Sequence, residues 1–283
     1  MSVGDLIAVD YQIELNGLLL GADTAYDLAE APDGTGVPDV KADDEQRPLT
    51  HGVVFGRDLM GGRKRSFKVW VFGTSPADAM AKLDALVGAW APTENTQTLV
   101  WRLPGTTRIE FGRPRKCDID LKWLPQATAS ASLQWVASDP RQYAAAQSSA
   151  TTGPRFTTGG RTYPKTYPKT YGASSAGSGS VICDNVGNVA SYPTCRVEGA
   201  TGAPIRLVNS TTGRILEIPV LLAADQSLTI DMAARTIVRE NGLPMFLPAA
   251  DWWPLEPGSN EVSFIAGGLS SSLLTITWRS AWI

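Results

Sequence analysis

The feature that most constrains this fold is an abrupt change of pattern between residues 133 and 172. Residues 129–137 alternate small or apolar side chains with more polar ones, which is the period of a half-buried β-strand. Asp139-Pro140 then ends the strand, because Pro140 has no amide hydrogen for a ladder and restricts the residue before it. The tract at 144–172 is mostly small and polar, and cannot offset the entropy cost of ordering. The chain is therefore expected to form two domains.

Residues 163–171 carry a Tyr-Pro-Lys-Thr repeat within this tract. A proline every fourth residue favours polyproline II, so the repeat predicts a semi-rigid spacer of roughly 28 Å at about 3.1 Å per residue. We interpret it as an interdomain linker whose tyrosines dock on a neighbouring surface; the alternative is a docking motif for a proline-binding module. The expected organisation is a first domain at 1–143, a linker at 144–172 and a second domain at 173–283.

The first domain is expected to be mainly β, with a barrel-like or sandwich-like arrangement, because short alternating runs are separated by turn signals. Residues 9–15 alternate most clearly, with the odd-numbered side chains expected on the buried face. Asn16-Gly17 accommodates positive φ, so residues 18–20 are expected to fold back as a hairpin partner. Further strands are expected at 51–55, 63–72, 99–103, 108–111 and 116–124.

One helix is expected in the first domain, at about residues 75–90. Ser75 can cap its start, Pro76 suits the first helical position, and Asp78 completes a capping box. An apolar stripe at helical spacing then predicts a helix that lies flat on a sheet. The residues expected in this stripe are Met80, Leu83, Val87 and Trp90.

Residues 22–48 form an acidic segment broken by prolines and glycines, and are expected to be a long loop. A loop of this length in a compact domain is usually functional or disordered. Its carboxylates lack the spacing of a calcium loop, so a solvated charge run is favoured. The Gly34-Thr-Gly36 sequence lacks the third glycine and the strand-to-helix context of a dinucleotide site. We therefore expect no metal and no cofactor.

Residues 63–72 are basic at the start and aromatic at the end, and both faces of this strand are expected to contact protein. The basic run is interpreted as a protein-contacting or solvated edge, because no interleaved aromatics or basic background support a phosphate site. The candidate subunit-interface residues are Arg63, Lys64, Arg65, Phe67 and Trp70.

The second domain is expected to be an antiparallel sandwich, since regular short strands alternate with turn signals. Trp252 and Trp253 are a candidate glycan platform, although burial in the core is the favoured interpretation of tryptophans in a small sandwich. The expected strands lie at 181–183, 194–198, 205–208, 215–222, 228–231, 236–240, 260–265 and 273–278.

Several function classes are disfavoured by charge and motif content. A net charge of −3 lacks the basic footprint of nucleic-acid binding, no apolar run is long enough for a membrane span, and the first residues do not resemble a signal peptide. We therefore expect assembly in a cytoplasm. No nucleophile elbow, P-loop or zinc-protease motif is present, so the chain is predicted not to be an enzyme. Cys117, Cys183 and Cys195 specify neither a disulfide framework nor a zinc site and are expected to be buried thiols.

The layout of the chain resembles the distal tail proteins of long-tailed, siphovirus-type bacteriophages. The resemblance rests on the order of four features: a β-rich first domain with one helix, Trp135 followed by Asp139-Pro-Arg-Gln-Tyr143, the repeat at 163–171, and a sandwich ending in Thr277-Trp-Arg-Ser-Ala-Trp282. It covers most of the chain. The acidic segment at 22–48 is longer than the pattern of that family.

This resemblance implies a role in the phage tail tip, at the distal end of the tail. The first domain is expected to form a homo-hexameric ring and the second a galectin-like sandwich, with no catalytic residues. The implied partners are the tail tube protein, the tape-measure protein and tail-tip proteins, with a host cell-wall glycan as a further candidate. The alternatives are another tail tube or baseplate component, or a glycan-binding sandwich module.

Overall fold

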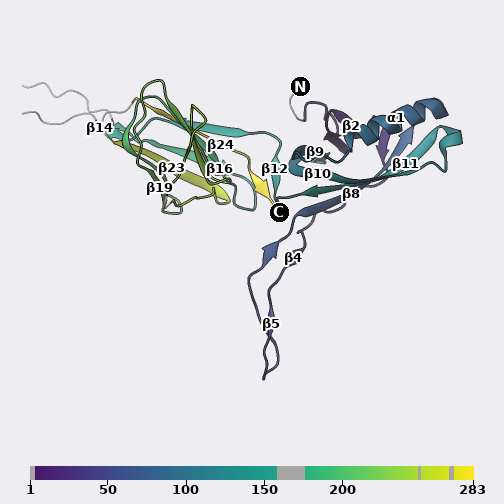
Figure 1. The fold of residues 1–283 in the computed structure, drawn as a ribbon, viewed down its shortest axis with the longest axis horizontal. Helices are drawn as coiled ribbons and strands as arrows, with labels where there is room; N and C mark the ends of the chain where they lie inside the picture. Colours follow the sequence, from purple (N-terminus) through teal and green to yellow (C-terminus); the bar gives the residue numbers. More distant parts are fainter. Residues whose placement is uncertain (1–3, 158–175, 248–249, 268–270) are drawn as a thin grey trace, which may run out of the picture. The chain divides into compact units, whose positions relative to one another are not determined.

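The computed structural model describes residues 4–157, 176–247, 250–267 and 271–283, and the chain divides into two compact units. The first unit comprises Met1–Ala145 together with Trp282–Ile283, and the second comprises Ala146–Ala281. Both units are built mainly from strands (Figure 1). The predicted fold class, mainly β with a helix in the first unit, is confirmed.

The first unit is organised on one antiparallel sheet with the strand order β2-β1-β9-β10-β11-β8-β3 (Figure 1). A short strand, β12, pairs with β10, and β25 pairs with β12. The strands of this sheet are β1 (Gln12–Leu15), β2 (Leu18–Gly21), β3 (Tyr26–Leu28), β8 (Arg63–Phe72), β9 (Gln97–Leu103), β10 (Thr106–Asp120), β11 (Thr128–Ala137), β12 (Gln142–Ala144) and β25 (Ala281–Trp282).

The hairpin of β1 and β2 turns at Asn16-Gly17, as predicted, with both residues at positive φ. The expected pattern of burial along residues 9–15 is wrong, however. Val9 and Tyr11 are exposed and precede the strand, whereas all four residues of β1 are buried. The strand is covered on both faces because Gln12 and Glu14 turn back to accept hydrogen bonds from the backbone of residues 6–9.

Helix α1 (Pro76–Ala89) covers one face of the sheet over β8 and β11 (Figure 1). It begins as predicted, with Ser75 Oγ accepting a hydrogen bond from the Asp78 amide at 3.2 Å. The apolar stripe differs from the prediction, because Met80 and Val87 are exposed. Ala79, Leu83, Leu86 and Trp90 face the sheet instead.

Strand β10 is longer than the sequence pattern predicts. Residues 108–111 and 116–124 were expected as separate strands, but Thr106–Asp120 is continuous, with an irregularity between Pro114 and Lys116. The 3-10 turn η1 (Leu124–Gln126) then leads into β11. The extra residue between Pro114 and Lys116 lets one strand continue past proline, which is how a bulge accommodates a residue without an amide hydrogen.

The acidic segment at 22–48 is not simply a loop. Its first part contains β3, and its second part runs out from the sheet as one side of a two-stranded arm, whose return side is formed by residues 52–61 (Figure 1). The short strands of the arm are β4 (Val40–Lys41), β5 (Glu45–Gln46), β6 (Val53–Val54) and β7 (Leu59–Met60).

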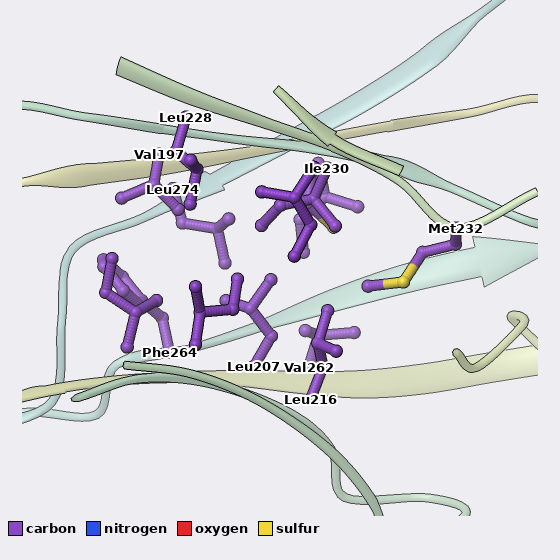
Figure 2. Packing of buried hydrophobic residues seen from close by; sticks show 14 of the residues in the cluster. Val197, Leu207, Leu216, Leu228, Ile230, Met232, Val262, Phe264 and Leu274 are labelled. Carbon is purple, nitrogen blue, oxygen red and sulfur yellow. The ribbon is translucent and has the colours of Figure 1, made fainter. Parts of the chain in front are cut away.

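The second unit is an antiparallel sandwich of a six-stranded and a four-stranded sheet, as predicted. Val197, Leu228 and Leu274 of the first sheet face Leu207 and Phe264 of the second across the core (Figure 2). In order, the six strands are β13 (Ser148–Thr152), β24 (Leu273–Trp278), β17 (Thr194–Glu198), β20 (Ser227–Asp231), β21 (Thr236–Arg239) and β22 (Pro244–Met245), and the four are β16 (Ser180–Asn185), β23 (Gly258–Gly267), β18 (Gly202–Asn209) and β19 (Arg214–Ile218).

Part of the expected linker belongs to the second unit. Residues 148–152 form β13, and all of β13 pairs with β24. Phe156–Thr157 (β14) pairs with Ala176–Gly177 (β15). The Tyr-Pro repeat at 163–171 lies outside the described residues. At the other end, Trp282 groups with the first unit, where the Arg108 guanidinium lies 3.4 Å from its ring centroid. The second unit therefore does not extend to the last residue, contrary to the expected boundary.

The three cysteines are free thiols. Cys183 and Cys195 are buried in the core of the second unit, whereas Cys117 is only partly buried, so the expectation of buried thiols holds for two of them. Burial, helped by the charge of Asp184, raises the pKa of Cys183 to about 12. Burial also raises the pKa values of Cys117 and Cys195.

Candidate functional site

The arm, defined as residues 39–61, is the most unusual element of the first unit. Its two sides pair through Val40–Met60 and Glu45–Val54, and the Gly61 amide donates to the Asp39 carbonyl at 2.8 Å. Every residue from 39 to 60 is exposed. A hairpin that buries nothing within its own chain gains little from folding alone, so this element is suited to contact another molecule.

The two sides of the arm differ in chemistry. The outgoing side carries four carboxylates and one lysine between residues 39 and 46. The return side presents exposed apolar side chains, and Phe55 has 83% of its surface accessible. Exposed apolar residues gathered on one strand mark an interaction surface more often than scattered ones do. The apolar residues of the return side are Val53, Val54, Phe55, Leu59 and Met60.

Arg63 fixes the base of the arm to the sheet. Its Nη1 donates to the carbonyls of Gly34 and Gly36, at 2.7 and 2.5 Å, and its Nε donates to the Pro140 carbonyl at 3.0 Å. Its side chain is buried, and burial lowers the pKa of this guanidinium. A buried cation needs acceptors in place of water. The three contacts therefore hold the segment that leads into the arm against the turn that follows β11.

Arg65 and Glu110 form an ion pair behind this anchor. Their closest atoms are 2.6 Å apart, and neither side chain has accessible surface. The indole nitrogen of Trp101 donates to the same carboxylate at 3.2 Å, and the Arg65 guanidinium lies 4.6 Å from the Trp101 ring centroid. The Gln142 amide oxygen, in the orientation that satisfies its surroundings, accepts from Arg65 at 2.7 Å. The cluster links the four strands β8, β9, β10 and β12 through buried polar contacts, which hold them rigidly together.

Asp139, just after β11, organises the turn that follows. Arg141 donates to it from both backbone and side chain, and the Tyr143 hydroxyl donates at 2.6 Å. Burial opposes ionisation of Asp139, but these hydrogen bonds outweigh it and lower the pKa of the carboxyl. Burial, and then the charge of the same carboxylate, raise the pKa of Tyr143. The Asp139-Pro140 stop seen in the sequence is therefore a charged turn.

The structure separates the five residues of the candidate interface strand. Arg63, Arg65 and Phe67 point into the first unit and are buried, so the expectation that they form a subunit surface fails for them. Lys64 is exposed and Trp70 half-buried on the opposite face. Strand β8 is also paired on both sides, with β11 along its whole length and with β3 at Val69–Val71, so it is not a free edge.

The candidate glycan platform does not form. Trp253 has no accessible surface and lies in the core of the second unit, and Trp252 packs against that core half-buried. A ring must expose a face to stack on a sugar, so burial, the favoured interpretation from the sequence, is what the structure shows for Trp253.

The described residues offer neither a metal site nor a membrane-spanning helix. In that part of the chain, His, Cys, Asp and Glu side chains do not gather in groups of three or more that could hold a metal ion. No helix there combines the length and the apolar character needed to cross a bilayer.

Comparison with known protein families finds a match in the second half of the chain. Residues 186–282 match the family described as siphovirus-type tail component, C-terminal domain. A comparison with curated proteins finds no match.

Solved structures extend the likeness to the whole chain. The SPP1 Dit protein (gp 19.1), described as a paradigm of the hub adsorption apparatus in phages that infect Gram-positive bacteria, matches with a TM-score of 0.67 and 16% identity, over 96% of this chain and 99% of that one. A chain of the phage P2 baseplate in its activated conformation with Ca matches with a TM-score of 0.52 and 12% identity, over 94% and 97%. The predicted resemblance to distal tail proteins is confirmed in the tail-component domain and in the fold.

Sequence reasoning missed two residues of the anchor. Glu110 lies in an unremarkable alternating run, and Gln142 follows the Asp-Pro turn, so neither carries a local signal. The available hint was Arg63-Lys-Arg65, because two arginines on the same, inward face of a strand require buried acceptors. That face was instead interpreted as an interface.

Proposed function

We propose that this protein is a structural subunit of a siphovirus-type tail tip, a distal tail protein whose first unit forms a ring of six copies. The observation that carries the proposal is the joint match of residues 186–282 to the tail-component domain and of nearly the whole chain to a hub protein fold. The ring would join the tail tube to tip and host-recognition proteins, and the virion would be its final location. No catalytic role is included in the proposal.

The arm favours a protein that assembles with other molecules over one that acts as a monomer. A strand pair that is exposed along its whole length, yet fixed at its base by buried arginines, is held ready to meet a partner. Each copy would use its arm to contact a different surface of the next copy. Contacts of this kind repeat from copy to copy, and they form a closed ring when the rotation that relates neighbouring copies returns to the first one. Partners such as the tube and tape-measure proteins belong to the proposal through the family likeness.

Native mass spectrometry of the purified chain tests the ring, with six-copy assemblies expected as the concentration rises. Electron microscopy of tails from a phage encoding this chain, with the chain tagged, is expected to place it in one ring at the distal end. Absence of the tag from the tail, or repetition of it along the tube, would overturn the proposal. The second outcome would favour the alternative of a tube component.

A glycan-binding module has less support. Its predicted platform depended on Trp252 and Trp253, and the second of these is buried in the sandwich core.

A further inference from the structure

Four buried polar atoms of the first unit have no hydrogen-bond partner among the described residues. Two are acceptors and two are donors, and they come from β8, β9, β10 and β11, which are neighbours in one sheet. The acceptors are Gln97 Oε1 and Glu110 Oε2, and the donors are Arg63 Nη2 and Trp135 Nε1. A buried polar atom without a partner costs free energy. Four such atoms within one sheet therefore indicate a further partner.

The two acceptors lie near each other on the inward face of the sheet. Glu110 of β10 pairs with Leu99 of β9, and Gln97 precedes Leu99 by two residues, so Gln97 and Glu110 are diagonal neighbours on one face. Diagonal neighbours in an antiparallel pair are about 7–8 Å apart, which is within reach of long side chains. Gly112, the residue that pairs with Gln97, has no side chain to enter the space between them.

We propose that this part of the sheet is a binding site for one buried water molecule, which bridges Gln97 Oε1 and Glu110 Oε2. Two oxygen acceptors in a buried site repel each other unless a donor lies between them. A water molecule can donate to both, and its own oxygen can accept from the unpaired nitrogen of Arg63 or Trp135. Buried waters typically make about three hydrogen bonds to otherwise unpaired polar groups.

The charges around the site select a neutral ligand. Arg65 lies 2.6 Å from Glu110 Oε1, and the Gln142 amide oxygen accepts from both Arg65 and Arg63, at 2.7 and 3.3 Å. Two guanidinium groups beside one carboxylate disfavour a metal ion or an ammonium group, because either would add positive charge. The two oxygen acceptors disfavour an anion such as chloride for the same reason. Water is neutral and donates twice, so it fits both requirements.

The bound water extends the anchor of the arm to β9. Arg63 holds the segment that leads into the arm, and Gln142 joins Arg63 to Arg65. Arg65 pairs with Glu110, and the water then joins Glu110 to Gln97. A buried polar network is rigid only when each of its members is satisfied. The water is therefore a structural part of the anchor.

A crystal structure of the full chain at high resolution tests the site directly. The expected result is a density peak for one water molecule at roughly 2.5–3.0 Å from both Gln97 Oε1 and Glu110 Oε2. A direct hydrogen bond from the side-chain nitrogen of Gln97 to Glu110 would overturn the proposal. So would an ordered Gln97 and Glu110 with no peak between them.

Magnetic relaxation dispersion of oxygen-17 water counts the long-lived internal waters in solution. Gln97→Met replaces the acceptor with an apolar side chain of similar length, so the count is expected to fall by one molecule relative to the unaltered chain. Gln134→Met is the matched control and is expected to leave the count unchanged, because Gln134 is exposed on the opposite face of β11. An unchanged count for Gln97→Met would overturn the proposal. Circular dichroism checks that both variants fold, and the crystal structure decides if Gln97→Met does not.

Discussion

Arg65 and Glu110 show how a single buried pair holds an element in place. Both side chains are inaccessible, and their guanidinium and carboxylate are 2.6 Å apart. Replacing Glu110 with Gln keeps the shape but leaves the Arg65 charge buried without its counter-ion. Since breaking a buried pair from one side costs about 3–5 kcal/mol, Glu110→Gln is expected to lower the free energy of unfolding of the first unit by about 3 kcal/mol. Urea unfolding followed by tryptophan fluorescence measures the loss.

A surface pair in the second unit provides the control. The Arg206 guanidinium and the Glu217 carboxylate are 2.7 Å apart, but each side chain has nearly half of its surface accessible. Glu217→Gln is expected to change the free energy of unfolding by less than about 0.5 kcal/mol. A loss below about 1 kcal/mol for Glu110→Gln would contradict the view that the anchor excludes water.

Asp139 gives a pH-dependent prediction. Its folded pKa lies below the ordinary value of 3.8, because hydrogen bonds from Arg141 and Tyr143 outweigh its burial. The ionised carboxylate therefore stabilises the fold above its unfolded pKa, and this contribution is lost as pH falls through the lower folded pKa. Asp139→Asn is expected to cost about 1–2 kcal/mol at pH 7. The difference from the unaltered chain should shrink below about pH 4, measured by urea unfolding across pH.

The exposed pair of Lys116 and Asp118 is the control for this effect. Asp118→Asn is expected to change stability by less than about 0.5 kcal/mol at pH 7. A constant cost of Asp139→Asn from pH 7 to pH 3 would show that the carboxylate is held by packing and not by charge.

Helix α1 illustrates what periodicity can and cannot decide for an element. Its start was predictable, since Ser75, Pro76 and Asp78 are local signals. The buried face was not, because residues 80, 83, 87 and 90 and residues 79, 83, 86 and 90 both fit a helical stripe, and the two differ by a small rotation. The contacts with the sheet decide between them: the Trp90 and Phe67 rings pack edge to face with their centroids 5.8 Å apart, and the Trp90 indole nitrogen donates to the Gln134 carbonyl.

Alanine substitutions distinguish the two stripes. Leu86 has no accessible surface, so Leu86→Ala is expected to cost about 2–5 kcal/mol through lost burial and a cavity. Val87 is 41% accessible, and Val87→Ala is expected to change stability by less than about 0.5 kcal/mol, because alanine is the better helix former. Thermal unfolding followed by circular dichroism compares the two variants, and a larger loss for Val87→Ala than for Leu86→Ala would favour the stripe expected from sequence.

At the scale of the whole molecule, strands and turns were predictable, whereas long-range partners were not. The sandwich follows from alternation along residues 181–278, where the expected strands are present, although the one expected at 215–222 ends at Ile218. The arm has no such signal, since its strands are two residues long and no face is buried against the same chain. Its two sides lie in segments that looked unrelated, an acidic loop and a short apolar run. A segment that buries no face within its own chain carries little information about its own fold in its sequence pattern.

Removing the arm separates its effect on folding from its effect on assembly. Asp39 and Gly61 are joined by a backbone hydrogen bond of 2.8 Å, so residues 40–60 can be replaced by a two-residue Asn-Gly turn. Because the deleted residues are all exposed, the free energy of unfolding is expected to change by less than about 1 kcal/mol. The mass in solution should remain that of a monomer at concentrations where the full chain assembles.

The two measurements, made on the same variant, assign the arm its role. Loss of assembly with unchanged stability means that the exposed strands serve the contact between copies. A large loss of stability would instead show that the arm supports its own sheet, against the burial pattern of residues 39–60. Retention of the ring would transfer the contact to another surface, such as the side of β10 at residues 113–120 that β9 leaves unpaired. Arg63 and its carbonyl partners Gly34 and Gly36 stay in the variant, so the anchor is not disturbed by the deletion.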